Sequence, residues 1–313
     1  MLSVTFLGTS AARPTVERNV SSLALTREGE TLLFECGEGT QRQMMRYGVS
    51  FALSEIFFTH FHADHFLGII GLVRTLGLQA RPEPLTLYGP RGAKKLLTQA
   101  LALGVERVPF PVEIVEVKPG DVIGAAGGGN RAPRSAYQIN VFATEHGNGA
   151  VGYALVEHER RGRFDVDKAR ALGIPEGPLW GKLTKGESIT TPDGKSYQPS
   201  DLVGANRPGR TVVITGDTRP CASVVAAAAG ADLLIHEATF GEEEKDRARE
   251  TQHSTARDAA QVALAARVKR LVLNHVSARY SISAEELVKE AREVFPDTMV
   301  AKDGLTVEVP FAD

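Results

Sequence analysis

Short apolar runs alternate with amphipathic segments along most of the chain, which is the pattern of strands and helices that pack in layers. A hairpin is predicted where Ser22–Thr26 and Thr31–Glu35 flank a Glu-Gly-Glu turn. Further strands are predicted at Ser3–Leu7, Glu55–Thr59, Leu85–Tyr88, Thr211–Thr215, Leu233–His236 and Leu271–Asn274. Helices are predicted at Gly37–Tyr47, Leu67–Leu78, Gly92–Leu103 and Thr255–Arg267, and from a capping box at Ser283–Glu286 to about Val294. Ser254 is the expected N-cap of the helix that starts at Thr255.

Two segments depart from this pattern. Gly124–Gly129 is rich in glycine and alanine and is predicted to be a surface loop. The stretch from His158 to Arg210 has few long apolar runs, and its ten lysines or arginines against seven acidic residues give a local charge of +3. We expect this stretch to be an excursion from a single domain that otherwise spans residues 1–313.

Composition, net charge and cysteine content indicate which class of protein this is. The chain is 42% hydrophobic and 24% charged, as is ordinary for a globular protein, and its net charge of −2 weighs only mildly against a nucleic-acid partner. Cys36 and Cys221 are too few for a disulfide framework and suit a reducing compartment. The first residues lack the basic and apolar regions of a secretory leader, so none is expected, and no apolar run of roughly 20 residues is present. A cytoplasmic protein without a membrane partner is therefore predicted.

Polar side chains follow four of the apolar runs. They are the segment His60–His65, Asp217, the pair His236-Glu237, and His275. In layered α/β folds, residues at the carboxyl ends of neighbouring strands converge on one crevice. The segment His60–His65 holds three of the eight histidines of the chain, which disfavours the alternative of a surface loop with histidines by chance. A metal site is predicted here.

The spacing inside this segment suggests two metals. Zinc takes imidazole nitrogen and carboxylate oxygen, as manganese and iron also do. On an extended segment His60 and His62 point to one side and Asp64 continues the spacing, whereas His65 must point toward a second position. One short turn can therefore serve two ions.

The remaining ligands must come from distant segments. His146, Asp217 and His275 each follow an apolar stretch. Taken singly, each would more often be a structural polar residue, but together they supply what the first cluster lacks. Two close cations need a bridging carboxylate, and Asp217 is the natural candidate.

The pattern His-x-His-x-Asp-His at His60–His65, followed by a distant His, Asp and His, resembles the metallo-β-lactamase superfamily. More narrowly, the whole chain resembles the tRNase Z family. That resemblance rests on His-Glu-Ala-Thr at 236–239 with His-Ser-Thr at 253–255, and on the segments 274–280, 177–183 and 14–19. The last segment departs from the family pattern Pro-x-Lys-x-Arg-Asn, because Val16 stands where the family has lysine. The position of cleavage, or the rejection of mature CCA-bearing tRNA, is therefore open to change here.

The resemblance implies an α/β fold, the metallo-β-lactamase αββα sandwich, with a protruding tRNA-binding arm at about residues 158–210. It also implies two Zn²⁺ per subunit, with Mn²⁺ possible. One ion would be held by His60, His62 and His146, the other by Asp64, His65 and His275, with Asp217 between them. Asp64 would also accept the proton of the attacking water. His253, held by Glu237, would protonate the leaving ribose oxygen or bind the phosphate, unless Glu237 is only a capping or surface carboxylate.

The implied activity is zinc-dependent removal of the 3′ trailer from precursor tRNA. Cleavage after the discriminator base would leave a 3′ hydroxyl on the tRNA and a 5′ phosphate on the trailer. A homodimer is implied, since the arm of one subunit could serve a tRNA bound partly by the other. Substrate contacts are expected at Arg18, Asn19, Ser277 and Arg279 and, in the arm, at Arg160, Arg161, Arg163, Lys182 and Lys185. For each arm residue the alternative is an ordinary solvated surface.

Two other functions stay open at this point. A different binuclear-zinc hydrolase of the superfamily, such as a small phosphodiesterase or an arylsulfatase-like enzyme, would not need the basic arm. A metal-stabilised RNA-binding protein without turnover would not need the complete ligand set or Asp64. Both are therefore less favoured than the endoribonuclease.

Overall fold

The structure of the chain, a computed structural model, describes residues 1–105, 107–124 and 136–312. It divides into two compact units. The first unit comprises residues 1–134, 138–156 and 210–313, and the second comprises residues 135–137 and 157–209. Apart from Gly124, the loop predicted at Gly124–Gly129 lies outside the described residues. Within the described ranges, no helix has the length and apolar character needed to cross a bilayer.

The first sheet of the first unit has seven strands in the order β16-β1-β2-β3-β4-β5-β6. The strands β2 and β3 form the predicted antiparallel hairpin, and β3 to β6 run parallel. Their bounds are β1 (Leu2–Gly8), β2 (Ser22–Arg27), β3 (Glu30–Phe34), β4 (Leu53–Phe57), β5 (Leu85–Gly89), β6 (Val112–Glu116) and β16 (Thr306–Glu308).

The second sheet also has seven strands, in the order β15-β14-β13-β12-β9-β8-β7. The strands β12 to β15 run parallel, so their carboxyl ends lie at one edge. Their bounds are β7 (Val122–Ile123), β8 (Tyr137–Ala143), β9 (Val151–Glu157), β12 (Thr211–Ile214), β13 (Leu233–Glu237), β14 (Leu271–Asn274) and β15 (Thr298–Val300).

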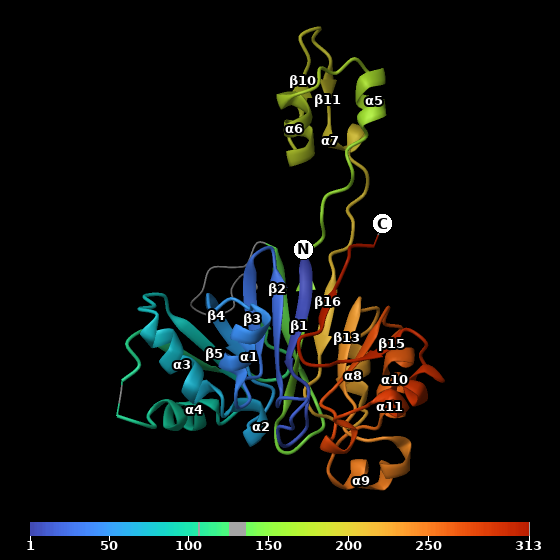
Figure 1. The fold of residues 1–313 in the computed structure, drawn as a ribbon. Coiled ribbons are helices and arrows are strands. Elements are labelled where there is room, and N and C mark those ends of the chain that lie inside the picture. The colour runs from blue at the N-terminus through green and yellow to red at the C-terminus, as the bar shows by residue number, and fades with distance from the viewer. Residues whose placement is uncertain (106, 125–135, 313) are drawn as a thin grey trace. The chain divides into compact units, whose positions relative to one another are not determined.

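Helices cover the outer face of each sheet (Figure 1). The first sheet carries α1 (Thr40–Tyr47), α3 (Ile69–Leu78) and α4 (Ala93–Leu101), and the second carries α8 (Ala222–Ala227), α10 (Ala256–Ala266) and α11 (Glu285–Arg292). Each set buries its apolar face in a separate core. Between the sheets, Tyr153 of β9 packs edge-on against Phe34 and Phe57. The first unit is therefore an αββα sandwich, as the resemblance implies.

Shorter elements lie in the connections. They are α2 (Ala63–Phe66), η1 (Glu242–Glu244), α9 (Lys245–Glu250) and η2 (Ala278–Tyr280). The helix predicted at Leu67–Leu78 is α3, which begins two residues later, at Ile69, and the short helix α2 directly before Leu67 was not predicted.

Two of the predicted helix caps are wrong. The N-cap of α10 is Thr255, whose hydroxyl accepts a hydrogen bond from the Asp258 N–H at 3.1 Å in a capping box. The Ser254 hydroxyl is used elsewhere, because it donates to the carbonyl oxygen of Thr218 at 2.6 Å. The N-cap of α11 is Ala284, so Ser283–Glu286 does not form a capping box.

The second unit covers almost the same residues as the predicted excursion. It contains α5 (Val166–Ala171), α6 (Pro178–Lys185), β10 (Ile189–Thr190), β11 (Ser196–Tyr197) and α7 (Pro199–Leu202). These elements enclose a small core of their own, made of Ala169, Ile174, Leu183, Ile189 and Leu202. The unit therefore has internal structure that its polar, proline-containing sequence did not indicate.

Candidate metal centre and its pocket

Histidines and aspartates from both sheets of the first unit meet at one place. The segment His60–His65 follows β4 of the first sheet. His146 follows β8, Asp217 follows β12 and His275 follows β14, all in the second sheet. The predicted convergence therefore exists but joins two sheets rather than one, because apolar runs alone do not say to which sheet a strand belongs.

The first group of donors consists of His60, His62, His146 and Asp217, whose ligand atoms lie within 4.8 Å of one another. His62 Nδ1 lies 3.1 Å from His60 Nε2 and 3.1 Å from His146 Nε2. The outward nitrogen of His146 donates to the carbonyl oxygen of Gln252 at 2.9 Å, and that of His60 lies 3.0 Å from the Thr59 hydroxyl. Such contacts fix the orientation of the rings, as metal-binding histidines require.

The second group consists of Asp64, His65 and His275. His275 Nε2 lies 3.2 Å from Asp64 Oδ2 and 3.3 Å from His65 Nε2. Asp217 Oδ2 lies 3.3 Å from His65 Nε2 and 3.4 Å from His275 Nε2, and also 3.6 Å from His60 Nε2. One carboxylate oxygen is thus close to ring nitrogens of both groups, which suits a shared ligand.

This donor set fits divalent cations. Asp217 is 2% exposed, and its Oδ1 has no hydrogen-bond partner among the described residues. Buried carboxylates are costly unless a cation or several donors face them. Imidazole and carboxylate are ligands for zinc and equally for manganese. The structure therefore brings together all the residues that were predicted as metal ligands. Which ion each residue would hold, and that Asp217 would be shared, stay predictions.

Electrostatics favour the metal-binding protonation state of Asp217, Asp64 and His60, whereas at His65 the Asp217 carboxylate outweighs burial and raises the pKa of the ring. Burial opposes ionisation of Asp217, but the rings of His275 and His65 hold its pKa well below the usual range. Burial also opposes ionisation of Asp64, and the same two rings lower its pKa. Burial and the nearby His65 ring lower the pKa of His60, so its ring is neutral at pH 7. Ionised aspartate and neutral imidazole are the ligating forms.

Backbone conformation brings the two sheets together here. Gly216, at the end of β12, has φ of +63°, and an added Cβ would lie 2.4 Å from Thr59 Oγ1. Only glycine combines this conformation with so close an approach. Gly216 therefore allows Asp217 to reach the segment that carries His60.

A second pair of residues lies beside the donors. His253 Nδ1 donates to Glu237 Oε1 at 2.7 Å, and Glu237 Oε2 accepts from the Thr239 hydroxyl at 2.6 Å. Burial lowers the pKa of His253, but the Glu237 carboxylate raises it more, to about 9. Glu237 is 2% exposed at the end of β13, so it is neither a surface carboxylate nor a helix cap. His236 of the same motif does not line the pocket over the donors, and its Nδ1 donates to the carbonyl oxygen of Glu237.

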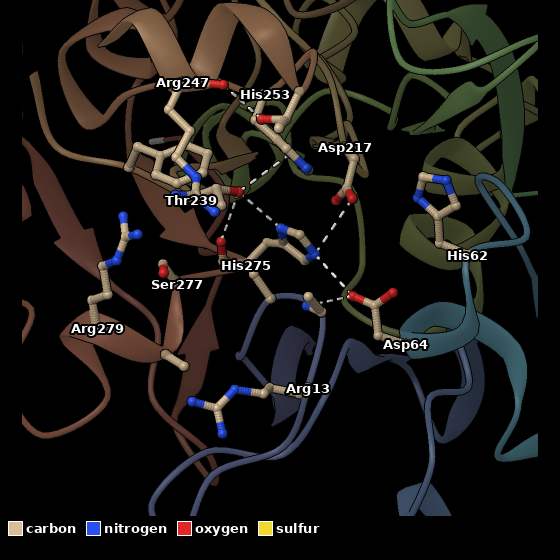
Figure 2. A pocket seen from close by; sticks show the side chains of 15 residues that line it. Arg13, His62, Asp64, Asp217, Thr239, Arg247, His253, His275, Ser277 and Arg279 are labelled. Atoms are coloured by element: carbon tan, nitrogen blue, oxygen red, sulfur yellow. Dashed lines mark hydrogen bonds and ion pairs between the residues drawn. The ribbon is translucent and has the colours of Figure 1, made fainter. Parts of the chain in front are cut away.

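A pocket of about 470 Å³ opens over these side chains (Figure 2). Its walls include the predicted residues His62, Asp64, Asp217, His253, His275, Ser277 and Arg279. Thr239 of the His-Glu-Ala-Thr motif also lines it, as do four residues that the sequence did not single out, Arg13, Phe240, Arg247 and Thr251. Metal donors, a protonated imidazole and cationic side chains thus share one cavity, which suits a phosphate-containing substrate.

Arg13 and Arg247 are the cations that sequence reasoning missed. In the view of Figure 2 they lie on opposite sides of His275. Among the described residues neither guanidinium has an ion-pair partner, whereas Arg279 pairs with Glu244. The guanidinium of Arg247 lies 5.9 Å from the ring centre of Phe240. No sequence signal separated these arginines from others, because their value depends on which wall of the pocket they reach.

The other residues that were predicted to contact the substrate do not line this pocket. Arg18 is 6% exposed, and its guanidinium donates to the carbonyl oxygen of Ala301 at 2.6 Å. Asn19 Nδ2 donates to the carbonyl oxygen of Glu38 at 2.8 Å. Both lie outside the pocket lining. The basic residues Arg160, Arg161, Arg163, Lys182 and Lys185 belong to the second unit, where Arg161 Nη1 donates to the carbonyl oxygen of Thr184. All these contacts stay predictions.

Known proteins resemble the chain over its full length. Residues 2–160 match the sequence model of the family described as anti-Pycsar protein Apyc1. The chain is 58% identical to a ribonuclease Z of Gemmatimonas aurantiaca, with 100% of this chain and 97% of that protein covered. It is 54% identical to a ribonuclease Z of Myxococcus xanthus, covering 100% and 99% of the two. The crystal structure of human tRNase Z, short form, is similar with a TM-score of 0.69 at 27% identity, covering 99% of this chain and 100% of that one.

Proposed function

The chain belongs to the ribonuclease Z family of proteins with the metallo-β-lactamase fold, and on this premise we propose that it is an endoribonuclease that processes the 3′ end of precursor tRNA. Cleavage after the discriminator base would leave a 3′ hydroxyl on the tRNA and a 5′ phosphate on the trailer. The observation that carries the proposal is the pair of donor groups that share Asp217, with His253 beside them in one pocket.

The donor groups define where two zinc ions would bind. His60, His62 and His146 would hold one ion and Asp64, His65 and His275 the other, with Asp217 shared. Bound there, the ions would activate a water molecule near neutral pH and offset the negative charge on the attacked phosphate. Manganese would suit the same ligands.

Asp64 is proposed to accept the proton of the attacking water. Its Oδ2 already accepts a hydrogen bond from the Ala12 N–H at 2.8 Å, which fixes the carboxylate against the pocket. Its lowered pKa keeps it ionised at neutral pH. A fixed, ionised carboxylate in the pocket wall supports this role as a general base.

His253 is proposed to protonate the leaving 3′ oxygen of the ribose. An alkoxide is a poor leaving group, so a proton donor in the pocket lowers the barrier. Glu237 holds the His253 ring through Nδ1, which leaves Nε2 for the substrate. The raised pKa of His253 means that the ring carries its proton at pH 7.

The pocket cations are proposed to position the RNA. Arg13 and Arg247 would contact phosphates next to the scissile one, since their guanidiniums have no ion-pair partner among the described residues. Ser277 and Arg279 line the same pocket and would extend this surface. Contacts to phosphates orient a nucleic acid without reading its sequence.

The second unit is proposed to be the tRNA-binding arm. Its basic residues include Lys182 and Lys185 on α6, and both are exposed. Recognition would then depend on the shape of the RNA and on salt concentration. A homodimer, in which the arm of one subunit serves a tRNA held partly by the other, is part of this proposal. A cytoplasmic location also stays a prediction.

Incubation of the purified protein with a precursor tRNA that carries a 3′ trailer tests the proposal. We expect cleavage that adding EDTA abolishes and zinc restores, with products whose ends can be mapped to the discriminator base. Turnover of a chromogenic phosphodiester without cleavage of the precursor would favour the small-substrate hydrolase. Binding of the precursor without any turnover would favour the RNA-binding protein.

A further inference from the structure

The segment Thr9–Asn19, here called the loop 9–19, joins β1 to β2 and touches residues of the second donor group. The Ala12 N–H donates to Asp64 Oδ2 at 2.8 Å. The carbonyl oxygen of Thr9 accepts from the Val276 N–H at 2.8 Å, and the Ala11 N–H donates to the carbonyl oxygen of Val276 at 2.9 Å. Because Val276 follows His275 directly, one loop contacts the carboxylate of Asp64 and holds the backbone next to His275.

Two residues at these contacts have unfavourable backbone conformations. Ala12 has φ of +60° and His275 has φ of +55°, although neither is glycine. Left-handed conformations of such residues persist only where the surrounding structure fixes them. The loop 9–19 must therefore be anchored firmly if it is to hold Asp64 and His275 in place.

The anchor is a relay of the buried residues Arg18 and Thr9 with the partly buried Asp303, here called the Arg18 relay. Arg18 Nη1 donates to Thr9 Oγ1 at 2.8 Å, and the Thr9 hydroxyl donates to Asp303 Oδ1 at 2.8 Å. Asp303 Oδ2 also accepts from the Asn19 N–H at 2.7 Å and from Gln43 Nε2 at 2.8 Å. The relay thus joins both ends of the loop to the segment before β16 and to α1.

The Arg18 and Thr9 side chains of the relay are buried, Asp303 is partly buried, and the charges of Arg18 and Asp303 depend on each other. Thr9 is 0% exposed and Arg18 is 6% exposed. Burial lowers the pKa of Arg18 and raises that of Asp303, and in each case the opposite charge of the partner acts against burial. Buried charges of this kind need fixed geometry, which suits an anchor and leaves the guanidinium little freedom to bind RNA.

We propose that the Arg18 relay positions the metal donors Asp64 and His275 through the loop 9–19, and that Arg18 does not contact the RNA. This inference rests on the proposed function only in taking those two residues as metal ligands. It departs from the role in substrate binding that the family resemblance implied for Arg18.

Thr9→Val is the informative variant, because valine keeps the shape of threonine and removes the hydroxyl that links Arg18 to Asp303. Thr9→Ser restores the hydroxyl. Thr5→Val is the matched control on β1, since the Thr5 hydroxyl lies 2.9 Å from that of Thr306 in an exposed position. Zinc affinity of the metal-free protein, measured against a chromophoric chelator, is compared with kcat and KM for precursor tRNA.

We expect Thr9→Val to weaken zinc binding by roughly 10–100-fold, the range for losing support behind a ligand. It should lower kcat and leave KM for the precursor unchanged, while Thr9→Ser and Thr5→Val behave like the unaltered protein. Faster hydrogen exchange of the loop 9–19 should accompany the loss. If Thr9→Val does not fold, Asp303→Asn is measured in the same way.

Two results would overturn the proposal. A raised KM of Thr9→Val at unchanged zinc affinity would mean that Arg18 contacts the RNA. Unchanged zinc affinity, kcat and KM would mean that the relay has only a structural role. A failure of the proposed function is distinguishable, because it would appear as absence of precursor cleavage by the unaltered protein. The zinc titration tests the relay in that case as well.

Discussion

Gly216→Ala is expected to separate the two sheets at the site without disturbing the chemistry of any ligand. The added methyl would lie 2.4 Å from Thr59 Oγ1 and 2.6 Å from Thr59 Cβ. Either β12 or the strand end that carries Thr59 and His60 must move away. Asp217 would then lose its shared position between the two donor groups.

The cost has two parts. A left-handed conformation costs alanine roughly 1–2 kcal/mol, and overpacking a tight site costs roughly 1–3 kcal/mol more. The free energy of unfolding should therefore fall by about 2–5 kcal/mol, against a usual total of about 5–15 kcal/mol. At about 2–4 °C per kcal/mol the melting temperature should fall by roughly 4–20 °C, and the protein should still fold.

Gly29→Ala is the matched control for this prediction. Gly29, in the turn between β2 and β3, has φ of +91° and nothing within 4 Å of an added Cβ. It should show only the conformational cost of roughly 1–2 kcal/mol. Thermal unfolding and zinc content are measured for both variants. Equal losses of stability, or full zinc content in Gly216→Ala, would refute the steric argument.

Four further predictions concern the site and the arm. His253→Ala should slow precursor cleavage by roughly 10²–10⁴-fold but hardly affect a nitrophenyl phosphodiester, whose leaving group needs no proton; equal losses would contradict its role as acid. Asp217→Asn should lose both ions, as atomic absorption would show; one ion at full occupancy would exclude a shared ligand. Arg247→Ala should raise KM for the precursor and Arg249→Ala on the same helix should not; equal effects would indicate only general charge. Deleting residues 160–198 should abolish precursor cleavage and spare a small phosphodiester; loss of both would mean a structural arm.

Features set by local sequence were predictable. Apolar runs gave the main strands of the core, and the cluster at His60–His65 directly after one of them indicated a metal site. Spacing in the sequence also separated His60 and His62 from His65. In the structure His62 lies with His60 and His146, and His65 lies with Asp64 and His275, although His60 and His65 also share a donor group with Glu35. Such features depend only on strand periodicity and on which side chains can bind a cation.

Features set by tertiary packing were not predictable in this way. Ser254 was a reasonable cap by residue type, but its hydroxyl serves the Thr218 carbonyl. Arg18 and Arg13 lie five residues apart in one loop, yet the first is enclosed and the second lines the pocket. Burial decides between these outcomes, and it depends on segments almost 300 residues away, such as Asp303.

The predicted metal ligands come from both layers of the sandwich, and this has a consequence for the stability of the protein. Neither half of the chain carries a complete set of ligands, so bound ions would fasten the two layers to each other. Metal uptake would then stabilise the folded state in proportion to the free ion concentration. A cell short of the bound metal would hold a less stable and more easily degraded protein as well as an inactive one, so the amount of enzyme would depend on the supply of that metal.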